Sequence, residues 1–150
     1  MEFTVGKDPG MIPHVLSQIL DTCINGITLS DPDQEDNPIV YANEAFELIT
    51  GYDRDEIVGR NCRFLQGEDR DQPEIDRIRE ALRERKAVTV TLRNYRKDGT
   101  LFYNQFSIRP LYDPDGRLIY YLGTQYDVTE KVRAEEELRR LNSLLAAADR

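Results

Sequence analysis

The sequence predicts an α+β fold, in which antiparallel strands are accompanied by helices. Apolar residues recur at helical spacing over 11–23 and 73–85, which is typical of amphipathic helices. Over 88–96, 101–111 and 118–128 the period changes to two, which is typical of strands. Because Lys-Asp-Gly and Asp-Pro-Asp-Gly turn signals join these strands in succession, they predict a three-stranded antiparallel meander.

The N-terminal part of the chain is predicted to add a helix and a hairpin. The helix over 11–23 carries Pro13 in its first turn, where a missing backbone N–H does no harm. Two strand-like segments, 26–30 and 39–42, flank the segment 31–38, whose Asp, Asn and Pro residues are typical of turns. These segments predict a first hairpin beside the meander.

Helices are predicted for the middle and the end of the chain. Between the hairpin and the meander, Asp53 and Glu56 have the spacing of a capping box, within short helical segments punctuated by glycines. Pro73 opens the next helix. From Thr129 onward, leucines and alanines alternate at spacings of four and three, as in a coiled-coil seam of barely two heptads. This seam predicts either a short coiled coil or a helix packed on its own sheet.

Length and composition indicate a single soluble domain. A chain of 150 residues with 39% hydrophobic content is long enough for one core. We expect an N-terminal extension with an amphipathic helix over 1–25, a core over 26–128 and a C-terminal helix over 129–150. No stretch approaches the ~20 apolar residues of a membrane helix, and the first residues lack the layout of a secretory signal. These features predict a cytoplasmic protein with no membrane partner.

Charge and motif content exclude several classes of function. The net charge of −8 would repel a phosphate backbone, so we expect no nucleic-acid partner. The two cysteines lie far apart without a Cys-x-x-Cys pair, so neither a metal site nor a disulfide is predicted. The sequence has one histidine, His14, and no hydrolase, zinc-protease or nucleotide-loop signature. We therefore expect no enzymatic activity.

Three amides are predicted to point toward apolar surroundings. Asn94, Asn104 and Gln125 each share a strand face with apolar residues of the meander. A buried amide without partners costs roughly 1–3 kcal/mol, so these amides need partners, either one another, the backbone or a ligand. Their occurrence on three successive strands favours a planar, polar ligand, because each amide offers a donor and an acceptor to a heterocycle edge. Gly123 would let such a ligand approach the backbone closely.

Two arginines are candidates for an anionic group of the same ligand. Paired guanidinium N–H groups, as Arg63 and Arg79 could supply, suit a phosphate. The alternative for Arg79 is a solvated charge beside its acidic neighbours on the helix. Both interpretations fit its position.

A sequence motif now adds a resemblance to a known family. The segment 59–67, Gly-Arg-Asn-Cys-Arg-Phe-Leu-Gln-Gly, resembles the signature of LOV (light, oxygen, voltage) photoreceptor domains, a flavin-binding branch of the PAS fold. Further matching motifs lie at 36–38, 43–46, 93–99, 102–104 and 123–125. The chain resembles the short LOV photoreceptor proteins of bacteria. The resemblance implies a five-stranded antiparallel sheet with helices on one face enclosing a flavin, plus N- and C-terminal flanking helices.

The resemblance also implies the roles of individual residues. Cys62 matches the thiol that attacks ring carbon C4a after blue-light excitation and forms a reversible bond, while N5 gains a proton. Gln125 matches the glutamine that faces N5, so its amide must change its hydrogen bonding. The implied cofactor-binding residues are Asn37, Asn61, Arg63, Leu65, Gln66, Arg79, Asn94, Asn104, Phe106, Ile108, Tyr121, Gly123 and Gln125. The arginines favour FMN, with riboflavin or FAD as alternatives.

Two residues depart from the commoner family pattern. Tyr103 stands where many members have Trp, and Thr28 stands where an aliphatic residue is frequent. These departures leave cofactor binding in place and bear on the lifetime of the lit state.

The expected output is a change in the packing of the flanking helices. Gln125 lies only four residues before Thr129, where the last helix begins. We therefore expect light to alter a homodimer formed through the terminal helices, which acts on an unknown downstream protein. Two other functions stay open, a flavin sensor that responds to reductant and a PAS dimerisation module that needs no flavin.

Overall fold

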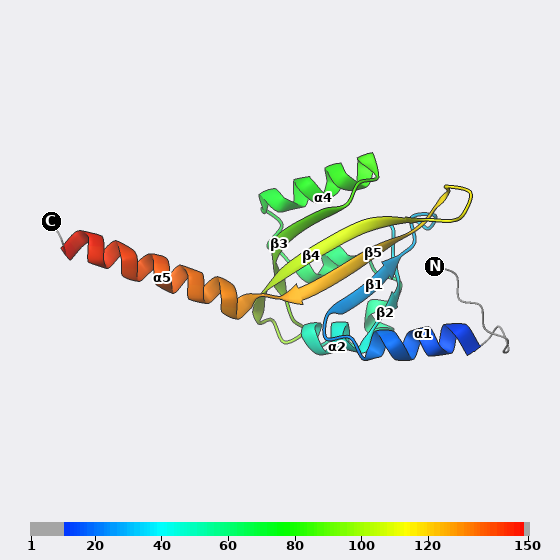
Figure 1. The fold of residues 1–150 in the computed structure, drawn as a ribbon, viewed down its shortest axis with the longest axis horizontal. Helices are drawn as coiled ribbons and strands as arrows, with labels where there is room; N and C mark the ends of the chain where they lie inside the picture. The colour runs from blue at the N-terminus through cyan, green and yellow to red at the C-terminus, as the bar shows by residue number, and fades with distance from the viewer. Residues whose placement is uncertain (1–10, 149–150) are drawn as a thin grey trace.

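A computed structural model describes residues 11–148 of the chain. The expectations about the first ten residues lie outside the described residues. The elements follow one another as α1 (Met11–Asp21), β1 (Gly26–Ser30), β2 (Ile39–Ala42), α2 (Glu44–Thr50), α3 (Arg54–Ile57), the 3₁₀ helix η1 (Cys62–Gln66), α4 (Pro73–Glu84), β3 (Val88–Tyr95), β4 (Leu101–Tyr112), β5 (Leu118–Asp127) and α5 (Thr129–Ala148). They form an α+β fold, as predicted (Figure 1).

The strands form one five-stranded antiparallel sheet in the order β2-β1-β5-β4-β3. The predicted hairpin is present as β1 and β2, and the predicted meander is present as β3, β4 and β5. In addition, β5 pairs with β1, which places Gly26 opposite Gln125 and Thr28 opposite Gly123. This pairing joins the two halves of the sheet and brings distant segments of the sequence into contact.

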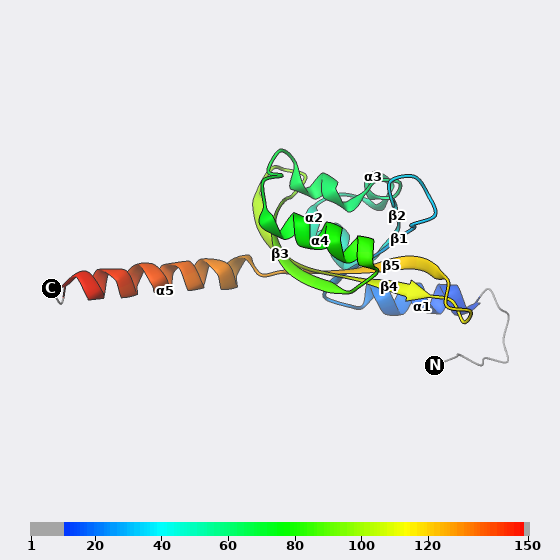
Figure 2. The same ribbon diagram turned by 90° about the horizontal axis from the view of Figure 1, so that it is seen from above.

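Helices α2, α3 and α4 cover one face of the sheet, whereas α1 lies on its other side (Figure 2). Strand alternation decides which side chains point to the covered face. In β3, for example, Val90, Leu92 and Asn94 are buried, whereas Thr89 and Thr91 are exposed. The core is therefore built between the sheet and the three covering helices.

The core consists of two apolar clusters that meet near η1. One cluster joins α4 to the meander through residues such as Ile75, Leu92 and Phe106. The other joins β2, α2, α3 and η1 and includes Phe46. Cys62 packs against both clusters. The thiol predicted to be functional thus lies where the two parts of the core meet.

Helix α5 extends away from the sheet as a separate arm (Figures 1 and 2). The hydroxyl of Thr129 accepts a hydrogen bond from the Tyr103 N–H at 2.9 Å, and Asp127 Oδ1 accepts from the Thr129 N–H at 3.0 Å. These bonds fix the start of the helix on β4 and β5. Beyond its start, four leucines are exposed: Leu138, Leu141, Leu144 and Leu145. The alternative in which this helix packs on its own sheet is therefore wrong.

Helix α1 ends earlier than predicted, at Asp21 rather than at residue 23. The carbonyl of Leu20 accepts a hydrogen bond from Asn43 Nδ2 at 2.9 Å, and the Cys23 N–H turns back to the same carbonyl at 3.2 Å. A side chain more than twenty residues away thus terminates the helix, which local periodicity could not reveal. Among residues 11–148, no helix is long and apolar enough to cross a membrane.

Candidate functional site

A cavity of about 250 Å³ lies between the sheet, α4 and η1. Its volume is close to the lower end of the range for small-molecule sites, about 300–1,000 Å³. All but two of the predicted site residues line it: Asn37, Asn61, Cys62, Arg63, Leu65, Gln66, Arg79, Asn94, Asn104, Phe106, Ile108 and Gln125. Arg70, Ile75, Ile78, Leu82 and Leu92 complete the lining. The fold thus brings segments from five elements and three loops to one place.

A short 3₁₀ helix, η1, positions the Cys62 thiol at this cavity. Asn61 caps η1, because its Oδ1 accepts from the Arg63 N–H at 3.0 Å while its Nδ2 donates to the Asp36 carbonyl at 2.7 Å. Asp36 and Asn37 both have positive φ, 67° and 47°, a left-handed conformation that Asp and Asn tolerate better than most residues. Their loop is therefore held against η1, and both segments line the same wall.

The Cys62 thiol is protonated at neutral pH. Burial raises the pKa of this thiol to about 11, although the nearby Arg63 guanidinium opposes the shift. The residue is half-buried and is one of those that line the cavity. Cys62 therefore offers the cavity both a sulfur atom and a proton, and Cys23 is a second free cysteine outside it.

The three predicted amides lie on the covered face of the sheet and are almost fully buried. Asn104 Nδ2 donates to Asn94 Oδ1 at 2.9 Å, and Asn94 Nδ2 donates to the Arg93 carbonyl at 2.9 Å. Gln125 Nε2 donates to the Thr28 hydroxyl at 3.4 Å. Within residues 11–148, however, Asn104 Oδ1 and Gln125 Oε1 have no hydrogen-bond partner. The amides satisfy one another only in part, which leaves two buried acceptors for a ligand.

Tyr121 and Gly123 differ from the prediction, because neither lines the cavity. Tyr121 packs in the core, and its hydroxyl donates to the Leu82 carbonyl at 3.2 Å. A Cβ built on Gly123 would lie 2.5 Å from Thr28 Oγ1, so the space above this glycine is filled by the protein. Gly123 is covered because the β1–β5 pairing places Thr28 opposite it, and Tyr121 is held in the core by its contact with α4.

The two predicted arginines line the cavity from different elements. Arg63 of η1 forms an ion pair with Asp36. Arg79 of α4 is 70% exposed, and its Nη1 lies 3.6 Å from Asp76 Oδ1. The alternative of a solvated charge thus also describes Arg79 in this structure. Both guanidiniums can reorient, because their present partners are exposed surface carboxylates.

A third arginine, Arg70, was not predicted. It lies in the loop before α4, where its Nε donates to the Gly67 carbonyl at 3.2 Å. The loop is fixed by Asp69, which accepts from Arg93 Nε at 2.7 Å and from the Tyr95 hydroxyl at 2.7 Å. These bonds hold the pKa of Asp69 at about 2, well below its usual value. The only sequence signal for Arg70 is its nearness to the 59–67 motif.

Comparison with known proteins assigns the family. A PAS domain family model matches residues 24–130. A solved structure described as "Flavin Analogue Sheds Light on Light-Oxygen-Voltage Domain Mechanism" is 40% identical with a TM-score of 0.73, and the match covers 89% of this chain and 99% of that chain. The chain belongs to the LOV branch of the PAS domain family. The predicted family and fold are therefore confirmed.

Longer proteins also contain this LOV domain. The blue-light photoreceptor of Listeria monocytogenes is 44% identical over 126 residues, which cover 84% of this chain and 49% of that protein. The solved structure of an RNA-binding light-oxygen-voltage receptor is 40% identical with a TM-score of 0.82, and it covers 100% of this chain and 42% of that chain. The LOV chain described here thus spans about half the length, or less, of these relatives.

Proposed function

We propose that this LOV domain is a blue-light photoreceptor, which holds FMN in the cavity and uses Cys62 as a reversible photochemical thiol. The observation that carries the proposal is a half-buried, protonated thiol in the same cavity as amides with unpaired oxygens. The relative named blue-light photoreceptor supports the same function. The domain would act as a sensor, without enzymatic activity of its own.

The polar groups of the cavity fit a flavin. Three amide oxygens without partners in the described part of the chain belong to cavity-lining residues, Asn37, Asn104 and Gln125. A flavin ring edge and its ribityl chain supply the N–H and O–H donors that such oxygens need. Asn94 and Gln66 add further amides to the same lining. A buried acceptor left unpaired costs about 1–3 kcal/mol, which a bound flavin would relieve.

The apolar walls and the arginines fit the rest of FMN. Leu65, Phe106 and Ile108 are buried residues that would pack on the faces of a planar ring. Arg63 and Arg79, now joined by Arg70, would hold the terminal phosphate through charge-assisted hydrogen bonds. A monophosphate matches this set best, whereas the pyrophosphate of FAD could use the same arginines and riboflavin would use none of them.

The cofactor chemistry would be an addition that needs no further reactant. A bound flavin would absorb blue light and offer ring carbon C4a to the Cys62 sulfur, while the thiol proton passes to ring N5. Cys62 is prepared for this role because its raised pKa keeps the proton on sulfur. In the dark, return of the proton to the Cys62 sulfur would restore the starting thiol.

Gln125 would convert this chemistry into a change in the protein. Its Oε1 is an acceptor without a partner among residues 11–148, and its Nε2 donates weakly to Thr28 at 3.4 Å. With N5 unprotonated, the amide would present Nε2 to the flavin and give up its bond to Thr28 on β1. With N5 protonated, it would present Oε1, which leaves Nε2 free to donate to Thr28 as in the structure.

The test is the visible absorption spectrum of the purified protein before and after a blue flash. We expect the flavin band to bleach and to return slowly in the dark. A Cys62→Ala variant should keep the flavin band without bleaching, and a Cys23→Ala variant should behave as the original chain. A colourless protein that takes up no added FMN would overturn the proposal in favour of a dimerisation module. A yellow protein that responds only to reductant would favour a redox sensor.

We further propose that the domain works as a homodimer through its terminal helices. Val15, Leu16 and Ile19 of α1 are exposed, and so are the leucines of α5. A second copy of the chain is the partner that would cover these apolar stripes. The homodimer would in turn act on a downstream protein. RNA binding belongs to one structural relative, and the net charge of −8 continues to argue against nucleic acid here.

A further inference from the structure

We propose that Gln72 is a positioning residue for the cavity, which holds the ligand-binding amides of β3 and β4 and the loop 67–72 in place from outside the cavity. Gln72 is buried, yet it is not among the residues that line the cavity. The ligand-binding part of this inference rests on the proposed function, because it needs a flavin. The hydrogen bonds of Gln72 exist without a ligand and can be tested separately.

Gln72 stands at the N-cap position of α4, but its side chain does not cap this helix. A polar side chain at an N-cap usually accepts from the N–H groups of its own helix. Here Oε1 accepts from the Arg93 N–H at 2.8 Å, while Nε2 donates to the carbonyls of Arg93 and Asp69 at 3.0 and 2.7 Å. The amide therefore uses its oxygen and both of its N–H donors on other segments of the chain.

Gln72 takes the place of a neighbouring strand beside β3. This strand lies at the edge of the sheet. Gln72 exchanges with the Arg93 backbone the two hydrogen bonds that a further strand would otherwise make. An outward carbonyl of an edge strand that has no such partner is free to turn toward water. Gln72 therefore fixes the peptide unit between Arg93 and Asn94 from the outside of the sheet.

The fixed carbonyl of Arg93 begins a chain of amides that ends at the cavity. It also accepts from Asn94 Nδ2 at 2.9 Å, and Asn94 Oδ1 in turn accepts from Asn104 Nδ2 at 2.9 Å. Because a carbonyl can only accept, Asn94 must direct its nitrogen toward Arg93 and its oxygen toward Asn104. Asn104, which lines the cavity, is then left with an oxygen that has no partner among residues 11–148. Gln72 thus stabilises the orientation in which the cavity wall offers an acceptor to a ligand.

An ion pair attaches the same loop to β3 a second time. Asp69 accepts from Arg93 Nε and Nη2 at 2.7 and 2.9 Å and from the Tyr95 hydroxyl at 2.7 Å. Arg70, the loop residue that lines the cavity, lies between the attachments at Asp69 and Gln72. These two attachments therefore fix the place from which Arg70 would meet the anionic end of a ligand.

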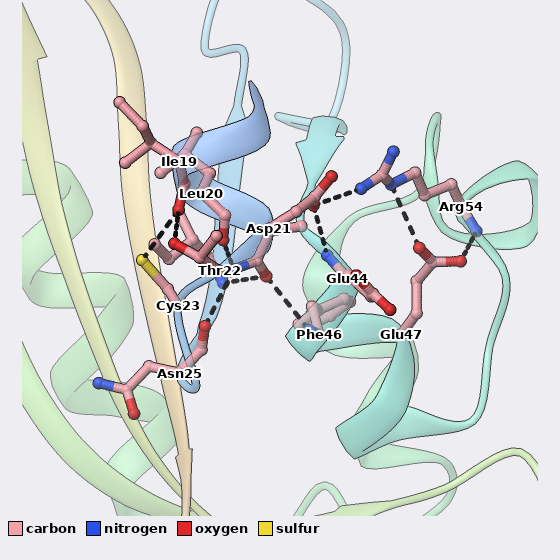
Figure 3. A network of polar contacts seen from close by, with 12 residues as sticks. Ile19, Leu20, Asp21, Thr22, Cys23, Asn25, Glu44, Phe46, Glu47 and Arg54 are labelled. Carbon is pink, nitrogen blue, oxygen red and sulfur yellow. Dashed lines mark hydrogen bonds and ion pairs between the residues drawn. The ribbon is translucent and has the colours of Figure 1, made fainter. Parts of the chain in front are cut away.

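A comparable network at the end of α1 provides a control, because no residue labelled in it lines the cavity (Figure 3). Asp21 Oδ1 accepts from Arg54 Nη2 at 2.6 Å. The side chains of this pair are 30% and 40% exposed, close to the 24% and 38% of Asp69 and Arg93. Loss of the Asp21 pair should therefore have a similar effect on stability without changing how a ligand is held.

Exchange of the Asn94 side-chain N–H groups with water, followed by NMR in the dark, tests the positioning without photochemistry. We expect these protons to exchange at least about tenfold faster in Gln72→Leu, which removes every hydrogen bond of the side chain. Gln72→Glu keeps the acceptor for the Arg93 N–H and loses both donors, so it should have the same effect. Gln105→Leu, the same substitution at an exposed position of β4, should have none. Unchanged exchange at Asn94 in both Gln72 variants would overturn the proposal.

Retention of flavin tests the effect on the ligand. Dissociation constants for FMN and riboflavin, measured by release on dilution, should both rise about tenfold in Gln72→Leu, because both the amides and the loop are loosened. Asp69→Asn and Arg70→Gln should weaken binding of FMN more than that of riboflavin, and Asp21→Asn should change neither. Unchanged retention of both flavins in Gln72→Leu would overturn the positioning role. A chain that binds no flavin would instead contradict the proposed function, and the Asn94 exchange would still decide what Gln72 does.

Discussion

Gly123 and Thr28 face each other across β1 and β5, with no room for a larger side chain at the glycine. A Cβ on Gly123 would meet Thr28 Oγ1 at 2.5 Å and Gln125 Nε2 at 3.2 Å. Overpacking of a core typically costs about 1–3 kcal/mol. We therefore expect Gly123→Ala to lower the free energy of unfolding by about this amount, as measured by urea denaturation.

A second substitution at the facing position provides the control. Thr28→Ala removes the oxygen that the new Cβ would meet, so the double variant should be more stable than the sum of the two single effects predicts. Strictly additive effects would mean that the close approach to Thr28 does not cause the destabilisation by Gly123→Ala. Thr28→Ala also removes the hydroxyl that accepts from Gln125 Nε2, so its effect on stability includes the loss of this hydrogen bond.

The raised pKa of Cys62 predicts how stability depends on pH at the alkaline end. Below about pH 9 the thiol is protonated in both the folded and the unfolded chain, so its contribution is fully present. Between about pH 9 and 11 the unfolded chain ionises while the folded chain keeps its proton, so stability is lost as the pH rises. By pH 11 the loss relative to Cys62→Ala should reach about 2–3 kcal/mol.

Urea denaturation of both chains at intervals from pH 8 to 11 checks this prediction. Taking the difference in stability between the original chain and Cys62→Ala removes the contribution of tyrosines and lysines, because both chains contain the same ones. Parallel stability curves would contradict the burial of the thiol.

At the residue scale, sequence patterns located most of the site because two local signals agree. Strand alternation placed Asn94, Asn104 and Gln125 on the covered face, and the 59–67 motif marked Cys62. Gly123 was predicted to make room for a ligand, but the structure places the Thr28 hydroxyl there. The alternation along a strand predicts which face of the sheet a side chain takes. It does not predict which distant strand pairs with it.

At the scale of elements, the loop from Gly67 to Gln72 shows how a non-local contact builds the site. Asp69 accepts hydrogen bonds from Arg93 and Tyr95 of β3, and Gln72 exchanges bonds with the Arg93 backbone at 2.8 and 3.0 Å. These contacts hold the segment that carries Arg70. Because the loop has no periodicity, its sequence could not indicate that an arginine within it would reach the cavity.

The lowered pKa of Asp69 predicts acid sensitivity of this loop. Its contribution to stability is fully present above about pH 4 and is lost as the pH falls toward 2, since the unfolded chain binds the proton first. We expect the stability of the original chain to fall more steeply over this window than that of Asp69→Asn. Urea denaturation at pH 5, 4, 3 and 2 measures both slopes.

The control for Asp69 is an exposed pair elsewhere in the chain. Glu137→Gln removes a carboxylate whose pKa is also lowered, in its case by Arg140 on α5. Its side chain is 55% exposed, so its removal should change the slope much less. Equal slopes for Asp69→Asn and the original chain would show that the ion pair with Arg93 does not stabilise the fold.

At the scale of the whole molecule, the order of the sheet and the direction of α5 were the features least accessible from residue patterns. Turn signals joined β3, β4 and β5 in sequence, whereas the pairing of β1 with β5 depends on the completed core. The resemblance to LOV domains supplied the overall fold that periodicity left open. Likewise, the seam over α5 fitted two arrangements, and only the structure separates them, because the helix leaves the sheet at Thr129 (Figure 1).

The exposed leucines of α5 predict that the molecule associates through this helix. Leu138, Leu141 and Leu145 lie on one stripe and are 59%, 44% and 65% exposed. If a second copy covers the stripe, Leu141→Glu should place an unpaired charge in the interface. Because burying such a charge is costly, we expect the dissociation constant of the dimer to rise at least tenfold. Sedimentation equilibrium over a concentration series measures the shift. Val58→Glu is the matched control, since Val58 is 47% exposed at the end of α3, on the side of the sheet opposite α1 (Figure 2). A dimer equally weakened by both substitutions would place the interface elsewhere, and a chain that is monomeric throughout would contradict association by the terminal helices.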